Sequence, residues 1–160
     1  MVILQDSIVI HKDVETVRRA FLDFAAYSVW RSLFIQSIKV TTPNKAPDSP
    51  ILSGDTLEVK IILPVSQKEN IFDPVVLENS EQRFRWKGKL IFDSIFAGEH
   101  KFEFVSIENG TKTSFIQSEE FTGLLAWPLL KFIGEDTQKG FSLFNEKFKE
   151  HVENTSLSVD

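Results

Sequence analysis

The spacing of apolar residues changes along the chain and separates helices from strands. Residues 2–10 are rich in Val and Ile, which predicts a strand. A short helix capped by Asp13 is then predicted by apolar residues spaced by three and four, namely Val14, Val17 and Phe21. A second short helix is expected over about 23–31.

From Phe34 onward the apolar residues alternate with polar ones, which predicts an antiparallel sheet with one wet face and one aromatic face. A loop is expected over 41–54, and a further strand over 68–78, weakened by Pro74. The residues predicted to face inward are Phe34, Ile38, Val40, Leu57, Val59, Ile61, Leu63, Phe84, Trp86, Gly88, Leu90, Phe96, Gly98, His100, Phe102, Phe104, Phe115, Gln117, Glu119 and Phe121.

The helical period returns near the end of the chain. An amphipathic helix of four to five turns is predicted from about Asp136 to Val152, with its apolar stripe at Phe141, Phe144, Phe148 and Val152. Gly134 is expected to interrupt a longer helix, so that 123–134 forms a separate short helix or an ordered loop.

These elements predict a single α+β domain over 1–154, with 155–160 as a frayed tail. Its antiparallel sheet has six to seven strands, and two short helices lie between the first two strands. Such a sheet is about 25–30 Å wide, whereas one helix covers only about 10 Å. The sheet must therefore curve around the long C-terminal helix, and the space between them is either filled by side chains or left as a cavity.

Composition excludes several functions. The chain has no cysteine, which rules out disulfides, zinc thiolate sites and cysteine nucleophiles. Its net charge is −5 and no basic face is interleaved with aromatics, so nucleic acid is not an expected partner. No apolar run approaches the roughly 20 residues of a membrane span, and the start lacks the pattern of a signal peptide. The expected location is cytoplasmic. Fifteen phenylalanines must line a dense core or a hollow one.

Five short motifs, taken in order, resemble the START-like superfamily, also called SRPBCC, which includes the birch-pollen allergen and the polyketide cyclase/dehydrase group. They are FAAYSVW at 24–30, FRWKG at 84–88, GEHKF at 98–102, EEFTGL at 119–124, and Gly140-Phe141 with Asn145. Arg31-Ser32 departs from the Asn-Pro of many relatives. The resemblance covers nearly the whole chain and implies a helix-grip fold with an internal cavity. Members bind lipids, sterols, hormones or polyketides; some are enzymes and some bind proteins.

The strongest hairpin signal is Asn109-Gly110. A two-residue turn there places Glu108 opposite Thr111 and sets the register of the strands on both sides. The resulting inward pairs are Phe104 with Phe115, Phe102 with Gln117, and His100 with Glu119. A histidine and a glutamate are thus predicted to be direct cross-strand neighbours inside the fold.

Three interpretations of the pair His100 and Glu119 remain open. The two groups could simply satisfy each other in the core. They could anchor a ligand together with Gln117 in an apolar pocket. They could also act as an acid and a base, with the carboxylate raising the histidine pKa. His11 and His151 lie at element ends, so no metal site is predicted, and no cofactor is expected.

The leading hypothesis is a non-enzymatic carrier or sensor of a small apolar molecule that is lipid-, sterol- or polyketide-like. Its predicted pocket residues are Phe34, Ile38, Val59, Trp86, His100, Phe102, Phe104, Phe115, Gln117, Glu119 and Phe144. The first alternative is a cyclase, dehydratase or hydrolase that uses His100 and Glu119. The second is a protein-interaction or co-chaperone domain, for which an exposed apolar patch near 124–132 would be the supporting observation.

Overall fold

The computed structural model describes residues 2–89 and 97–155 and shows two antiparallel sheets and one long helix. The elements are β1 (Val2–Ile10), α1 (Val14–Leu22), the 3-10 turn η1 (Phe24–Ala26), β2 (Ile35–Val40), β3 (Leu57–Ile62), β4 (Glu69–Phe72), β5 (Val75–Asn79), β6 (Arg83–Lys89), β7 (Ala97–Ile107), β8 (Lys112–Thr122) and α2 (Ala126–Thr155). The sheet orders are β1-β8-β7-β6-β5 and β2-β3-β4.

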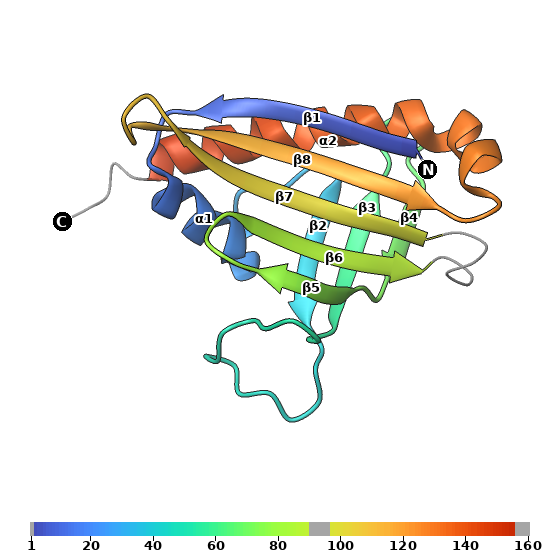
Figure 1. Cartoon of the computed structure of the whole chain (residues 1–160), viewed down its shortest axis with the longest axis horizontal. Helices are drawn as coiled ribbons and strands as arrows, with labels where there is room; N and C mark the ends of the chain where they lie inside the picture. The colour runs from blue at the N-terminus through green and yellow to red at the C-terminus, as the bar shows by residue number, and fades with distance from the viewer. Residues whose placement is uncertain (1, 90–96, 156–160) are drawn as a thin grey trace.

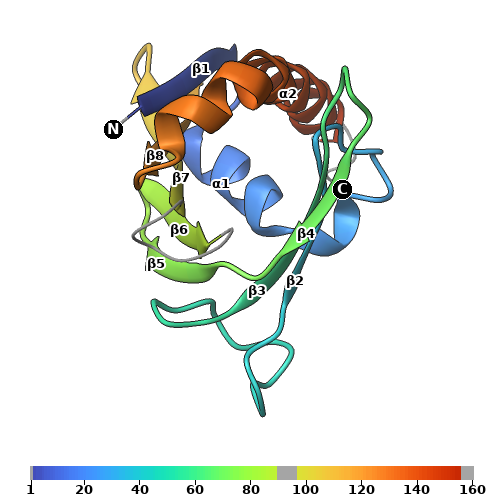
Figure 2. The same cartoon turned by 90° about the vertical axis from the view of Figure 1, so that its right-hand side faces the viewer.

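The two sheets and α2 surround one aromatic core. Figure 1 shows α2 running behind β1 and β8, and Figure 2, turned by 90°, shows the five-stranded sheet on one side, the three-stranded sheet on the other, and α2 across the top. This arrangement confirms the predicted α+β class and the helix-grip architecture. Leu90 and Phe96, predicted to face inward, and residues 156–160 of the predicted tail lie outside the described residues.

The segment predicted as one strand over 68–78 is two strands, and each belongs to a different sheet. β4 pairs with β3, whereas β5 pairs with β6. Asp73-Pro74 separates them, because proline has no N–H to donate and interrupts the ladder. The bridge between Thr56 and Val75 joins the two sheets. The described residues therefore contain eight strands, rather than the expected six to seven.

The first predicted helix is confirmed, and the second is present only as the short 3-10 helix η1 within its predicted range. α1 begins after Asp13, whose carboxylate accepts from Thr16 N at 3.0 Å. In place of a helix over 23–31 the chain forms η1 and a series of turns. The Tyr27 hydroxyl donates to Phe21 O at 2.7 Å, and Arg31 has a φ of 57°. That left-handed backbone stops the helical path and turns the chain toward β2.

The start of β2 departs from the simple alternation predicted for it. Phe34 has a φ of 68° and precedes the strand, and the pairing with β3 shifts between Ile35 and Ser37. A bulge of this kind changes which side chains face inward. Ile38 is buried as predicted. Val40 pairs with the buried Leu57 and so lies on the same face, but it is the last residue of the strand and is 39% exposed.

α2 is one continuous helix, not a helix that begins after Gly134. Pro128 lies in the first turn, where its missing N–H has no intrahelical partner to lose. One glycine in a helix costs only about 1 kcal/mol. The buried stripe passes straight through Gly134, and the burial of this whole face outweighs that cost. Its members are Ala126, Leu130, Gly134, Thr137, Gly140, Phe141, Phe144, Asn145, Phe148 and Val152.

The two glycines inside α2 provide a matched test of packing. A Cβ on Gly140 would overlap the Phe34 ring, whereas a Cβ on Gly134 would meet only Leu130 Cβ at 3.9 Å. We expect Gly140→Ala to lower the free energy of unfolding by about 1–3 kcal/mol, and Gly134→Ala to raise it by up to about 1 kcal/mol. Urea denaturation followed by circular dichroism measures both, and equal changes would contradict this account of Gly140.

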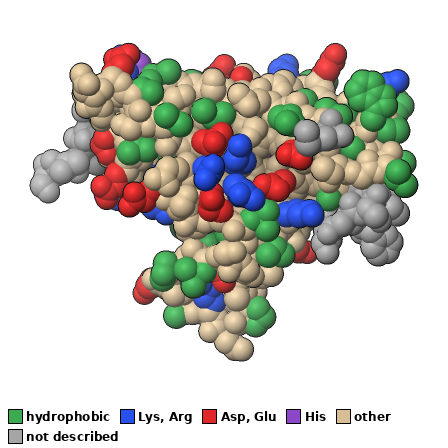
Figure 3. Space-filling model, viewed as in Figure 1, with side chains coloured by type: hydrophobic (Ala, Val, Ile, Leu, Met, Phe, Trp, Pro, Cys, Tyr) green, Lys and Arg blue, Asp and Glu red, His purple; other side chains and the backbone are tan. Residues whose placement is uncertain are grey.

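The outer face of the large sheet carries mixed charges, as Figure 3 shows with acidic and basic side chains gathered over its middle strands. Arg83 pairs with Glu78 and Arg85 pairs with Glu99, each at 2.9 Å. Because cations and anions alternate there, this face is not a single-sign surface. Such exposed pairs contribute little to stability.

Candidate functional site

A cavity of about 280 Å³ lies between the two sheets at the end where α2 begins. Its walls come from β3 and β4 on one side, from β6, β7 and β8 on the other, and from the first half of α2. The lining residues are Phe34, Ile35, Ile61, Leu63, Lys68, Asn70, Phe72, Trp86, Gly88, Gly98, His100, Glu119, Phe121, Ile133 and Thr137. Most are apolar, which is the usual character of a small-molecule pocket.

Two cross-strand glycines help to make the cavity. Gly88 of β6 pairs with Gly98 of β7. A Cβ on Gly98 would lie 2.5 Å from Glu119 Oε1, and one on Gly88 would lie 3.3 Å from the Phe72 ring. Because neither glycine has a side chain, the Glu119 carboxyl and the Phe72 ring can occupy their positions in the cavity wall without a clash.

The predicted pairing of His100 with Glu119 is confirmed. The loop takes residues 108–111, with positive φ at Glu108, Asn109 and Gly110, and the ladder ends at the pair Ile107 and Lys112. Gly110 N donates to Ile107 O and Thr111 N donates to Glu108 O, each at 3.2 Å. The register that follows places His100 opposite Glu119. His100 Nδ1 lies 3.6 Å from Glu119 Oε2, which is too long for a strong hydrogen bond.

Behind His100 a chain of hydrogen bonds crosses the interior to β1. His100 Nε2 lies 2.8 Å from Gln117 Oε1, and Gln117 Nε2 donates to Asn145 Oδ1 at 2.9 Å. Asn145 Nδ2 in turn donates to Asp6 Oδ2 at 3.0 Å. Four elements, β7, β8, α2 and β1, therefore contribute to one polar network in an otherwise aromatic core.

This network assigns the histidine tautomer. The amide nitrogen of Gln117 is committed to Asn145, so its oxygen faces His100. Nε2 of His100 must then carry the hydrogen and donate it, which leaves Nδ1 without one. The bare Nδ1 is the nitrogen that faces Glu119.

Burial keeps both members of the pair uncharged at neutral pH. It lowers the pKa of His100 to about 3, against a smaller opposing effect of the Gln117 hydrogen bond. It raises the pKa of Glu119 to about 8. The Glu119 side chain is 17% exposed to the cavity, so water there limits its desolvation. The expectation that the carboxylate raises the histidine pKa is wrong, because burial lowers the pKa of His100 and Glu119 itself keeps its proton at neutral pH.

The pair predicts a stability maximum below neutral pH. The contribution of Glu119 to the free energy of unfolding is complete below its ordinary pKa of 4.5 and is lost as pH rises toward 8. That of His100 is complete above 6.5 and is lost as pH falls toward 3. From pH 6.5 to 8 we expect the free energy of unfolding to fall by about 2 kcal/mol. Urea titrations across this range should show the fall in the wild type, and none in Glu119→Gln; an equal fall in both would contradict this origin.

Comparison with solved structures shows the fold. No protein-family model matches the chain, and no curated protein matches it. The Zhui aromatase/cyclase from Streptomyces sp. R1128 aligns with a TM-score of 0.74 at 5% identity, over 97% of this chain and 95% of that one. A START superfamily protein from Mycobacterium smegmatis aligns with a TM-score of 0.67 at 16% identity, over 96% and 98% of the two chains. The chain has the START-like fold. The protein TTHA0849 from Thermus thermophilus shares it at a TM-score of 0.69 and 14% identity, over 99% and 100% of the two chains.

In this START-like fold, four of the eleven predicted pocket residues line the cavity: Phe34, Trp86, His100 and Glu119. The other seven lie deeper, in the packed core or in the polar network, and for them ligand contact stays a prediction: Ile38, Val59, Phe102, Phe104, Phe115, Gln117 and Phe144.

Sequence reasoning missed part of the wall and part of the network. Ile61 and Leu63 line the cavity and had been placed on the inner face by their alternation, so that signal was present. Lys68 and Asn70 come from a short strand and its preceding turn, which have no clear pattern. Asn145 stands among phenylalanines on the buried stripe of α2, and a lone amide in an apolar stripe is a signal for a buried network.

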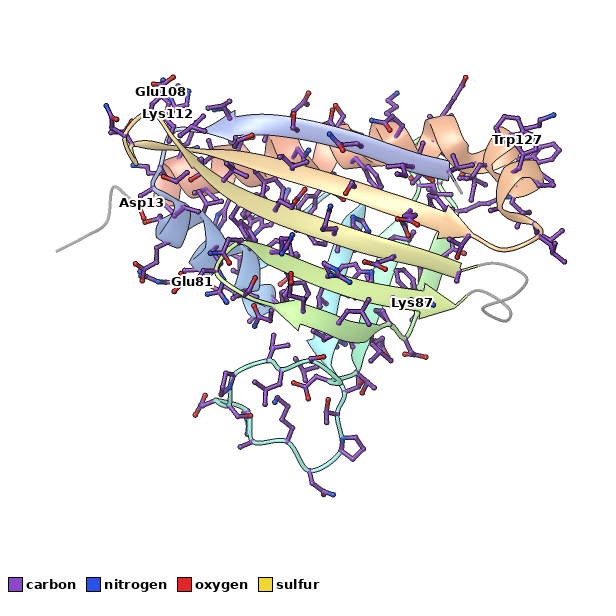
Figure 4. All side chains as sticks on the ribbon, viewed as in Figure 1. Asp13, Glu81, Lys87, Glu108, Lys112 and Trp127 are labelled. Atoms are coloured by element: carbon purple, nitrogen blue, oxygen red, sulfur yellow. The ribbon has the colours of Figure 1, made fainter. Side chains whose placement is uncertain are left out.

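An exposed apolar patch lies where α2 begins in this START-like fold. Leu124 and Phe132 are more than four-fifths exposed, and Trp127 is 64% exposed, with Lys131 Nζ 5.6 Å from its ring centre. Figure 4 shows Trp127 pointing outward from this end of the helix. This is the surface that the protein-interaction hypothesis predicted.

Among residues 2–89 and 97–155, no helix is long and apolar enough to cross a membrane. The same residues contain no cluster of three or more acidic or histidine side chains that could hold a metal ion.

Proposed function

We propose that the chain binds a compact, mainly apolar molecule in the cavity between its sheets and acts as a carrier or sensor of it. The observation that supports this most directly is the cavity itself, with aromatic walls and a polar pair held in place from behind. Apolar walls with a few fixed polar groups are what orient a small ligand. A filled core would leave no such space beside Glu119.

The cavity volume narrows the ligand class. About 280 Å³ is slightly below the usual range of roughly 300–1,000 Å³ for ligand pockets. A molecule of one or two rings, such as a small polyketide-like compound, fits this space better than a sterol or a long-chain lipid.

The test is native mass spectrometry of the purified protein, followed by denaturing extraction of any bound molecule. We expect a co-purifying apolar species in the wild type, and its loss in Ile61→Trp, where the larger ring fills the cavity. Ile62→Trp is the matched control, because adjacent residues of a strand face opposite sides. Circular dichroism checks that both variants fold. A folded Ile61→Trp that retains the ligand at wild-type occupancy would refute binding in this cavity.

A second candidate function is acid catalysis of the cyclase or dehydratase type. It is favoured by the position of Glu119, which lines the cavity as a carboxylic acid beside the bare Nδ1 of His100. One structural match is named an aromatase/cyclase. If Glu119 donates a proton to a substrate oxygen, the rate should fall above pH 8 as the acid ionises. A rate that is the same in Glu119→Gln would exclude this role.

A further inference from the structure

The ionisable groups of the cavity lie in two different environments. Among the described lining residues there are three: Lys68, His100 and Glu119. His100 is buried and committed to Gln117 through Nε2. Glu119 and Lys68 are therefore the two groups with capacity left for a ligand, and their surroundings differ.

Glu119 is the polar group at the buried side. Within residues 2–89 and 97–155 its carboxyl makes no hydrogen bond, and His100 Nδ1 lies 3.6 Å from its Oε2. This carboxyl faces the cavity and is 17% exposed, so its hydrogen-bonding capacity is available to a ligand group. The protonated form offers one donor and one acceptor, which suits a hydroxyl or a carbonyl.

Lys68 is the cation at the exposed side. It follows the turn at the end of β3, where 65–70 are all exposed. The turn is held to α2, because the Asp136 carboxylate accepts from Val65 N at 2.7 Å and from Ser66 N at 3.0 Å. Lys68 O also accepts from Leu63 N at 3.0 Å. Its ammonium has no ion-pair partner in the described part of the chain, so an unpaired cation on an anchored turn stands at the rim of an apolar cavity.

We propose that the ligand is an amphipathic acid, with its anionic group at Lys68, its compact apolar body against Phe72 and Trp86, and a hydroxyl or carbonyl at Glu119. This inference rests on the proposed function, since it names the ligand class of the same cavity. An anion at the rim remains partly hydrated while it pairs with the ammonium, so it avoids the cost of full burial. The neutral end enters the part of the cavity where both protein groups are uncharged.

An amine ligand fits these groups less well. It would need an ionised Glu119 in a place where burial raises the pKa of this acid to about 8. It would also bring a cation past Lys68. Both effects favour a neutral oxygen function at the buried end and negative charge at the rim.

Three probes of matched shape test this ligand class by isothermal titration calorimetry near pH 6, where Glu119 holds its proton. They are 6-hydroxy-2-naphthoate, its methyl ester, and 2-naphthoate without the hydroxyl. We expect the hydroxy acid to bind about tenfold more tightly than either of the others, since each lacks one polar contact.

Three variants assign each contact. Lys68→Gln should lower the affinity for the hydroxy acid to that for its ester and leave the affinity for the ester unchanged. The control Lys39→Gln, at an exposed position of β2, should change neither affinity. Glu119→Gln should keep the preference for the hydroxyl, because an amide still donates and accepts. Glu119→Leu should remove that preference.

The outcomes separate the two proposals. If acid and ester bind equally, or if Lys68→Gln binds the acid as the wild type does, the amphipathic-acid class is overturned while ligand binding in the cavity stands. If none of the three probes binds and no molecule co-purifies, both proposals fail.

Discussion

Trp86→Ala is expected to lower the free energy of unfolding by about 3–5 kcal/mol, because it removes a large ring from a packed interior. Trp86 is 1% exposed. Its ring contacts Phe84, His100 and Phe102 at centre distances of 6.1, 5.1 and 5.2 Å. Urea denaturation followed by far-UV circular dichroism measures the loss without depending on the fluorescence of the removed residue.

Trp127→Ala is the control for this substitution. Trp127 is 64% exposed at the start of α2, so the same change there should alter the free energy of unfolding by less than about 0.5 kcal/mol. Because Trp86 also forms a wall of the cavity, Trp86→Ala should enlarge it and allow bulkier ligands to bind. Losses of equal size in the two tryptophan variants would contradict the packing described for Trp86.

Asn145→Leu is expected to cost about 2–4 kcal/mol, although leucine is similar in size and suits a helix. The loss arises because the Gln117 amide nitrogen and the Asp6 carboxylate each lose their Asn145 partner. A buried group such as Gln117 costs about 1–3 kcal/mol when it is left without a partner, and Asp6, which is only partly buried, adds a smaller cost. The measurement is again the free energy of unfolding in urea, compared with Glu146→Leu at the neighbouring exposed position of α2, which should change little.

A second readout separates this network from simple packing. Asn145 fixes the orientation of the Gln117 amide, and that amide fixes which nitrogen of His100 carries the hydrogen. In Asn145→Leu the Gln117 amide is free to turn, so the ¹⁵N chemical shifts of His100 should change from one tautomer to a mixture. An unchanged tautomer together with an unchanged stability would show that the network has no role.

The hairpin shows how much short-range sequence information can determine. Asn109-Gly110 favours one turn geometry, and side chains in strands alternate, so the turn alone predicts the register of β7 and β8. That register correctly placed His100 opposite Glu119 without reference to any other part of the chain. The environment of the pair could not be predicted, because desolvation depends on the elements packed around it.

The predictions that differ from the structure, at Gly134 and around Pro74, were made from local signals alone. Gly134 and Pro74 were both treated as local interruptions. Gly134 does not break α2, because a long buried face against β1 and β8 offsets a small local cost. Pro74 does interrupt its strand, and the result is a crossing between two sheets that no local pattern describes. Intrinsic propensity gives the free-energy cost of placing a residue in a helix or strand. Tertiary packing determines whether other interactions offset that cost.

The α+β class, the first helix with its cap, the strand register of the hairpin and the pairing of His100 with Glu119 all follow from the sequence alone. They depend on spacing and turn chemistry, which act over a few residues. The existence of a cavity, the position of Lys68 at its rim, and the support of His100 by Asn145 and Asp6 became known from the packed structure. Those features join residues up to 139 positions apart, and their contacts depend on how sheets and helix pack, which no local pattern encodes.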